Sequence, residues 1–232
     1  MDDPNVPREE LAAALRFIRL VNRRLGGERA LMRNLRRWSR NWPRDRAVTM
    51  LDVATGSADL PVAAVRWARD HGFDLRVTGV DLHAMTLEFA REHVERNGDV
   101  ADAITLVEAD ALRLADRFAP ESFDYVHAGL FLHHLGDLEA LTMLRIMDKL
   151  ARAGIVWNDL ERSRAALAVT WLITLPTPSI VRHDATVSVR AGFTRKEVLE
   201  MARRLELTYV RYHLDMLAQR FTLAGERAHA WV

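Results

Sequence analysis

The spacing of apolar residues changes along the chain. Near its start, Leu11, Leu15 and Ile18 recur at steps of three and four residues, which predicts a helix over 8–24. A similar stripe predicts a second helix over 28–38. After residue 47 this spacing gives way to short apolar, β-branched runs that alternate with helical segments.

The alternation beyond residue 47 predicts a doubly wound α/β fold. Apolar runs predict strands over 48–54, 75–80, 104–108, 123–130 and 154–158. Amphipathic or apolar segments predict helices over 61–70, 85–97, 138–150, 165–175 and 194–205, the last opened by the capping-box pattern of Thr194 and Glu197. Strands and helices that alternate at this spacing build a parallel sheet with helices on both faces.

Composition narrows the class of protein. The 232 residues are 49% hydrophobic and 28% charged, as in a globular chain of one domain or of one domain with an added lobe. The absence of cysteine excludes disulfides, cysteine-ligated zinc, iron–sulfur clusters and a cysteine nucleophile. Since neither a secretory signal nor an apolar run of membrane-spanning length is evident, we expect a cytoplasmic protein.

Arginine is concentrated in the first fifth of the chain. Residues 1–46 contain twelve arginines against six acidic residues, whereas the net charge of the chain is +1. We interpret this segment as a helical lid whose apolar stripe covers a ligand site while its arginines stay in water. An RNA-binding arm is the alternative, but the segment lacks interleaved aromatic residues.

Three acidic residues mark the ends of the first three predicted strands. They are Asp52, Asp81 and Asp110, spaced at intervals of 29 residues. Ligands of doubly wound sheets bind outside the carboxyl ends of the strands. The dinucleotide glycine fingerprint and the Walker loop are absent, which argues against a nicotinamide enzyme and against an anchored phosphate. Three carboxylates instead suit S-adenosylmethionine, which offers a ribose diol, an adenine amino group and a sulfonium.

Four segments resemble the motifs of class I S-adenosylmethionine-dependent methyltransferases. They are LDVATGSADLP at 51–61, VTGVDLH at 77–83, ITLVEADALRL at 104–114 and FDYVHAGLFLHHL at 123–135. The last has the form found in small-molecule enzymes of quinone pathways and polyketide tailoring. Each motif alone is weakly specific, but all four occur in order within residues 47–160. Residues 153–163 and 182–202 resemble a subgroup associated with aromatic polyketide synthesis.

The resemblance implies which residues hold the methionine part of the cofactor. Asp52 and the turn Thr55-Gly56-Ser57 would face it, and His127 and Ala128 would line the wall beside it.

The same resemblance implies which residues bind the nucleoside part of the cofactor. Asp81, followed by Leu82, would accept both ribose hydroxyls with its two oxygens. Asp110 would accept from the adenine amino group, while the Ala111 N–H meets a ring nitrogen.

The chain departs from the family in the glycine loop. Ala54 and Ala58 stand where the family carries glycine, which allows a close approach of the backbone or a positive φ. We expect the small alanines to preserve the close approach at negative φ. A weakened cofactor site, or a non-catalytic member of the fold, is the alternative.

Methyl transfer requires in-line alignment of the acceptor and exclusion of water. An oxygen acceptor also benefits from a base that removes its proton. The candidate bases are His133, His134, Asp159 and His183. We rank His134 first because it follows the fourth strand, then His183 and then Asp159. The sequence contains no evident set of metal ligands, so no metal is expected.

The resemblance also divides the chain. Residues 1–46 would form the lid and residues 47–232 a catalytic domain with a seven-stranded, mostly parallel Rossmann-like sheet. An antiparallel hairpin over 207–214 and 217–223 would close the sheet. Within this domain, the inserted segment 161–192 would help to form the acceptor pocket. Its apolar side chains suit either that pocket or the core: Trp171, Leu172, Ile173 and Leu175.

The sequence therefore predicts an enzyme that transfers a methyl group from S-adenosylmethionine to a small, apolar, phenolic or polyketide-like acceptor. Oxygen is the preferred acceptor atom and carbon the next. An RNA methyltransferase and a degenerate, non-catalytic protein with this fold are the alternatives. A small-molecule acceptor is the expected partner, with no nucleic acid and no membrane span, and a homodimer stays open.

Overall fold

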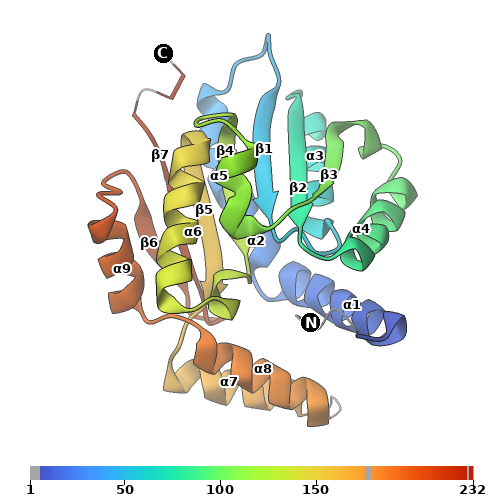
Figure 1. The fold of residues 1–232 in the computed structure, drawn as a ribbon, viewed down its shortest axis with the longest axis vertical. Helices are drawn as coiled ribbons and strands as arrows, with labels where there is room; N and C mark the ends of the chain where they lie inside the picture. The colour runs from blue at the N-terminus through green and yellow to red at the C-terminus, as the bar shows by residue number, and fades with distance from the viewer. Residues whose placement is uncertain (1–5, 176–178, 229, 232) are drawn as a thin grey trace.

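The computed structural model describes residues 6–175, 179–228 and 230–231. It contains a seven-stranded sheet in the order β3-β2-β1-β4-β5-β7-β6. The first five strands are parallel, and β7 runs antiparallel to both β5 and β6 (Figure 1). The strands are β1 (Val48–Val53), β2 (Leu75–Asp81), β3 (Ile104–Glu108), β4 (Phe123–Gly129), β5 (Ala151–Leu160), β6 (Arg211–Asp215) and β7 (Arg220–Glu226). The predicted fold class is confirmed.

Two helical layers cover the sheet because successive strand residues point to opposite faces. On β1, Met50 joins one core and Leu51 joins the other. The first core contains α2 (Gly27–Trp38), α3 (Asp59–Asp70) and α4 (Ala84–Arg96). The second contains α5 (Leu114–Arg117), α6 (Asp137–Leu150) and α9 (Arg195–Arg204).

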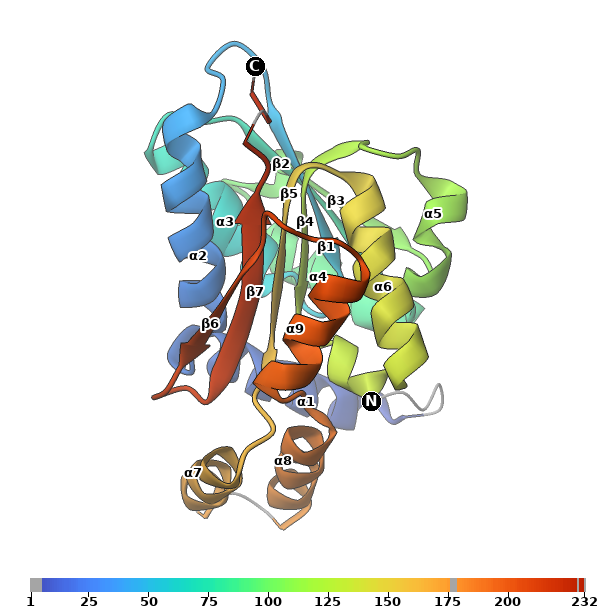
Figure 2. The same cartoon turned by 90° about the vertical axis from the view of Figure 1, so that its left-hand side faces the viewer.

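Three further helices lie at the carboxyl ends of the strands (Figures 1 and 2). Helix α1 (Arg8–Arg24) lies across these ends, and α7 (Arg164–Thr174) and α8 (Ser179–Ala191) project as a pair below the sheet. In the described part of the chain, no helix combines the length and apolarity needed to cross a membrane.

Several element boundaries differ from the predicted ones. The first strand of the closing hairpin begins at Arg211 rather than at Leu207, because the preceding residues form a turn whose Leu207 is anchored in the core. Helix α8 was not predicted from the sequence. His134 ends the short 3₁₀ helix η4 (Leu132–His134), and α6 begins at Asp137.

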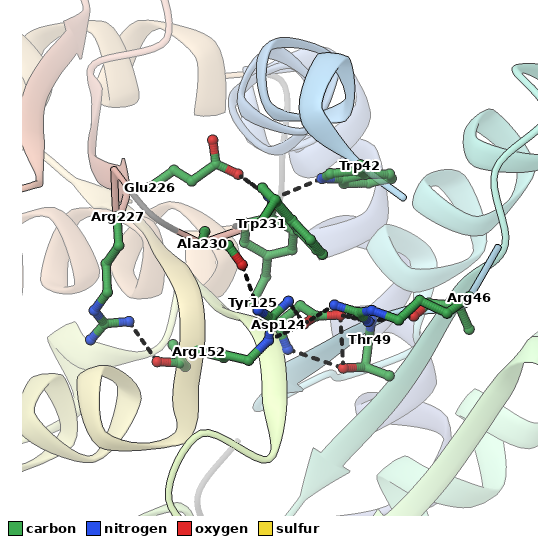
Figure 3. A network of polar contacts seen from close by, with 12 residues as sticks. Trp42, Arg46, Thr49, Asp124, Tyr125, Arg152, Glu226, Arg227, Ala230 and Trp231 are labelled. Carbon is green, nitrogen blue, oxygen red and sulfur yellow. Dashed lines mark hydrogen bonds and ion pairs between the residues drawn. The ribbon is translucent and has the colours of Figure 1, made fainter. Parts of the chain in front are cut away.

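A polar network holds the end of the chain at the amino ends of the strands (Figure 3). The buried carboxylate of Asp124 accepts hydrogen bonds from Arg46, Arg152 and the Thr49 N–H. Arg152 also donates to the Ala230 carbonyl, at 2.5 Å. The network therefore ties β1, β4 and β5 to the chain terminus at the end of the sheet that lies opposite α1.

Candidate functional site

A cavity of about 410 Å³ lies at the carboxyl ends of β1, β2 and β4, and this volume is typical of a small-molecule site. Its lining includes most of the residues predicted from sequence: Asp52, Thr55, Gly56, Asp81, Leu82, Asp110, Ala111, His127 and His134. Ser57 and Ala128 are buried next to it, and Asp159 is fully buried away from its wall. The side chain of His183 lies outside the described residues.

The loop between β1 and α3 adopts left-handed backbone conformations. Ala54, Gly56 and Ala58 have φ of 53°, 56° and 55°. The expectation of negative φ at the two alanines is therefore wrong: they adopt the conformation that favours glycine, at a cost of roughly 1–2 kcal/mol each. Two hydrogen bonds hold the loop, from the Thr55 N–H to the Val80 carbonyl and from the Gly56 N–H to Asp81 Oδ2, at 2.9 and 3.0 Å.

Strand register places Asp52 beside His127 within the sheet. Asp52 Oδ1 lies 2.5 Å from His127 Nδ1, and its other oxygen accepts from the Thr55 hydroxyl at 2.6 Å. Both side chains are buried. Because the carboxylate accepts from Nδ1–H, it favours the imidazole tautomer in which Nε2 is a hydrogen-bond acceptor.

His127 Nε2 is buried and has no hydrogen-bond partner among the described residues. Buried polar atoms are rarely left unpaired, so this one indicates a ligand or water at that point. The imidazole lines the cavity beside Gly129. A Cβ at Gly129 would lie 3.4 Å from Nε2, so the glycine leaves the ring edge open to the cavity.

Two carboxylates stand at the ends of β2 and β3. Asp81 accepts from the N–H groups of Gly56 and His83, and burial is the main cause that raises its pKa. Asp110 caps the following turn by accepting from the Leu112 N–H at 2.9 Å. Both side chains therefore shape the loops that they follow, and both also face the cavity.

The sequence interpretation missed several polar residues of the cavity wall, among them Asn22 on α1 and Asp59 at the start of α3. Asn22 Nδ2 donates to Asp59 Oδ2 at 3.1 Å, and its amide oxygen accepts from the buried Arg220 at 3.2 Å. Burial raises the pKa of Asp59. The signal was present, since Asn22 is a polar residue that continues the stripe of Leu15 and Ile18 at helical spacing.

A second histidine–carboxylate pair lies beyond the cavity wall. His133 Nδ1 is 2.6 Å from Asp159 Oδ1, and Asp159 also accepts from the N–H groups of Leu160 and of the Trp157 ring. Burial acts to raise the pKa of Asp159, but the charge and hydrogen bond of His133, together with the hydrogen bonds from Leu160 and Trp157, outweigh it, and the pKa is lowered. The His133 ring packs against His134, with centroids 4.2 Å apart. Of these three residues, only His134 lines the cavity.

Helix α1 covers the cavity at the carboxyl ends of the strands. Its Leu11, Leu15 and Ile18 line the apolar part of the wall, and Leu15 lies 3.8 Å from the point where a Gly56 Cβ would stand. At one end, Arg8 is paired with two acidic residues of α4, Glu88 and Glu92. The helix therefore docks through apolar contacts and exposed ion pairs.

Comparisons with known proteins bear on this site and its fold. Residues 50–154 match the family described as "Methyltransferase domain". No curated protein matches the chain at the significance required. The solved structure of magnesium protoporphyrin IX methyltransferase from Synechocystis PCC 6803 with bound SAH has a TM-score of 0.61 at 12% identity, covering 88% of this chain and 85% of that one.

Two further structures share the fold at low identity. A SAM-dependent methyltransferase from Aquifex aeolicus has a TM-score of 0.55 at 15% identity, covering 77% of this chain and 81% of that one. An O-methyltransferase family protein from Burkholderia thailandensis has a TM-score of 0.58 at 18% identity, covering 79% of this chain. The match covers 52% of that protein, so the chain spans about half of its length. The comparisons therefore confirm the predicted fold, and they identify a methyltransferase domain over residues 50–154.

Proposed function

We propose that the chain transfers a methyl group from S-adenosylmethionine to a small, apolar, phenolic or polyketide-like acceptor, at oxygen in the first place and at carbon in the second. The observation that carries the proposal is the single cavity wall that combines the Asp52–His127 pair, the left-handed loop and the carboxylates of Asp81 and Asp110.

The residues present fit the cofactor at its polar end. His127 Nε2 would accept a hydrogen bond from the methionine ammonium, and the nearby carboxyl of Asp59 would add a second acceptor. Asp81 would receive the ribose hydroxyls, and Asp110 with the Ala111 N–H would hold the adenine edge. When bound, S-adenosylmethionine supplies a methyl group activated by its sulfonium.

The remaining wall suits an apolar acceptor next to a base. Leu11 and Ile18 of α1 face the cavity together with Phe131, Leu135 and His134. These side chains would exclude water and orient the acceptor, which is most of what methyl transfer requires. We propose His134 as the group that removes the acceptor proton, with Asp159 and His133 as positioning residues behind it. His183 stays a candidate base on the sequence pattern alone.

Arginine pairing favours the lid over a nucleic-acid arm. Arg8, Arg29 and Arg46 are each paired with acidic side chains of the chain itself. We therefore propose that residues 1–46 serve as a helical lid and that no nucleic acid is bound.

Calorimetry with S-adenosylmethionine tests the proposed cofactor site. Asp81→Ala removes the acceptor for the ribose diol, so its affinity should fall about tenfold or more, since hydrogen bonds to a charged group contribute roughly 1.5–3 kcal/mol. Asp116→Ala, which removes an exposed carboxylate paired with Arg113 on the surface, serves as the control. Unchanged affinity in a folded Asp81→Ala variant would rule out this placement of the ribose.

Transfer of a labelled methyl group to a panel of alkyl-substituted phenols tests the acceptor class.

A further inference from the structure

Helix α7 exposes apolar side chains to solvent. Trp171, Leu172, Ile173 and Leu175 are 53%, 63%, 45% and 41% exposed. None of them lines the cavity, and none belongs to the buried core. The two roles considered for these side chains from sequence, acceptor pocket and core, therefore do not account for their position.

The apolar character of this surface extends around the helix. Residues 165–175 contain no charged side chain. Helices that are apolar on all sides are normally buried, and contiguous exposed apolar patches mark interaction surfaces. Helix α7 instead lies in the projecting pair with α8, outside both helical layers of the sheet (Figure 2).

Arginines flank this surface in the sequence, and two of them already have partners: Arg162 pairs with Glu197, and Arg182 donates to the Leu175 carbonyl. Between Glu161 and Asp184 the sequence contains no acidic residue, but it contains Arg162, Arg164 and Arg182. Arg164 is exposed at the start of α7. A tryptophan and aliphatic side chains flanked by arginines, without acidic residues, are typical of segments that bind the interface of anionic membranes.

We propose that the exposed face of α7 binds the surface of a lipid bilayer with anionic headgroups. The helix has 11 residues, which corresponds to roughly 16 Å, and spanning a bilayer requires about 20 residues, so α7 would lie in the plane of the interface. Trp171 and its aliphatic neighbours would enter the headgroup–acyl boundary, and the exposed Arg164 would contact the phosphates.

A second copy of the chain fits this surface less well. In a twofold-symmetric dimer the same patch faces itself, so the exposed Arg164 of one copy would lie near that of the other, with no acidic residue between positions 161 and 184 to offset the two charges. An anionic bilayer supplies the missing charge.

The position of this surface suits delivery of an apolar acceptor. Helix α8 contacts η4, whose His134 lines the cavity. Membrane binding by α7 would thus bring the cavity close to acceptors dissolved in the bilayer. This consequence rests on the proposed function, whereas the membrane contact itself does not.

Co-sedimentation of the full chain with vesicles tests the contact. We expect binding to vesicles of phosphatidylglycerol and phosphatidylcholine, and much weaker binding to phosphatidylcholine alone. The double variant Trp171→Ala/Leu172→Ala should lower the partition coefficient at least tenfold. Arg164→Ala should lower binding to the anionic vesicles selectively. Leu138→Ala, at a leucine of α6 that is 78% exposed, is the matched control and should bind like the wild type.

Two outcomes would overturn the proposal. One is the absence of binding to either kind of vesicle by the wild-type chain. The other is a stable dimer in sedimentation velocity that the double variant converts to a monomer, which would assign the patch to a second copy. Calorimetry with S-adenosylmethionine checks that the double variant is folded. Because vesicle binding needs no methyl transfer, its failure is distinguishable from a failure of the proposed function.

Discussion

At the scale of single residues, two alanines in the loop between β1 and α3 have a strained backbone conformation that glycine would relieve. Ala54 and Ala58 have positive φ, where glycine is not penalised. After the greater flexibility of glycine in the unfolded chain is allowed for, Ala54→Gly should raise the free energy of unfolding by about 0.5–1 kcal/mol. Ala58→Gly should change it less, because the substitution also removes a fully buried methyl group, which contributes roughly 0.8 kcal/mol. Urea denaturation measures this.

The matched control for the loop variants is Ala13→Gly in α1. Ala13 is an exposed residue in the middle of a helix, where glycine costs about 1 kcal/mol, so the control should change stability in the opposite direction. Destabilisation by both loop variants would mean that the alanines do not have the left-handed conformation in solution.

The proposed base is a second prediction at this scale. General-base catalysis contributes typically 10²–10⁴-fold, so His134→Ala should lower kcat by about this factor while cofactor affinity is unchanged. Asp159→Asn should lower kcat less, because Asp159 acts through His133. His213→Ala, at an exposed histidine of β6, is the control. If His134→Ala retains the wild-type rate and pH profile with a phenolic acceptor, transfer proceeds without this base.

At the scale of elements, α1 should control how fast the cofactor leaves. Arg8 docks it on α4 through exposed ion pairs, which contribute roughly 0–1 kcal/mol. Arg8→Ala should therefore speed dissociation of S-adenosylmethionine up to about fivefold, since 1.4 kcal/mol corresponds to a factor of ten. Stopped-flow measurement gives this rate, with Arg16→Ala, an exposed arginine of the same helix, as the control. Equal rates in both variants would show that docking depends on the apolar contacts alone.

Elements with a regular apolar period were predictable, and elements defined by long-range contacts were not. The five parallel strands follow from β-branched runs, and the sheet order places Asp52, Asp81 and Asp110 at one edge. The strand pairing that joins Asp52 to His127 is not visible in local sequence, because it depends on register between distant segments. The contact between Asn22 and Asp59 was not predictable for the same reason, since it joins α1 to α3, although the helical spacing of Asn22 was visible in the sequence.

At the scale of the whole molecule, the two ends of the sheet have different roles. The carboxyl ends contain the left-handed loop and the unpaired His127 Nε2, which are features of a binding site. The amino ends contain the Asp124 network, whose donors come from two segments: Arg46 and Thr49 around the start of β1, and Arg152 at the start of β5 (Figure 3). This division predicts that the hydrogen-bond network at the amino ends of the strands can be weakened without loss of cofactor affinity.

Asp124→Asn tests this division. Burial acts to raise the pKa of Asp124, but hydrogen bonds from Arg46, Thr49 and Arg152 outweigh it and lower the pKa. A carboxylate with a lowered folded pKa stabilises the protein above its unfolded pKa of about 3.9, and this stability is lost as the pH falls through the folded value. The free energy of unfolding of the variant should therefore be about 2 kcal/mol or more below that of the wild type at pH 7. This difference should narrow below about pH 4.

Denaturation of both proteins between pH 7 and pH 3, with calorimetry of S-adenosylmethionine binding at pH 7, measures the two effects. Affinity should be the same in wild type and variant, because Asp124 lies at the opposite end of the sheet from the cavity. Asp116→Asn, at an exposed carboxylate, should change stability by no more than about 0.5 kcal/mol. A difference in free energy of unfolding that stays constant down to pH 3 would show that the charge of Asp124 does not stabilise the amino ends of the strands. A fall in affinity would show that the two ends of the sheet are coupled.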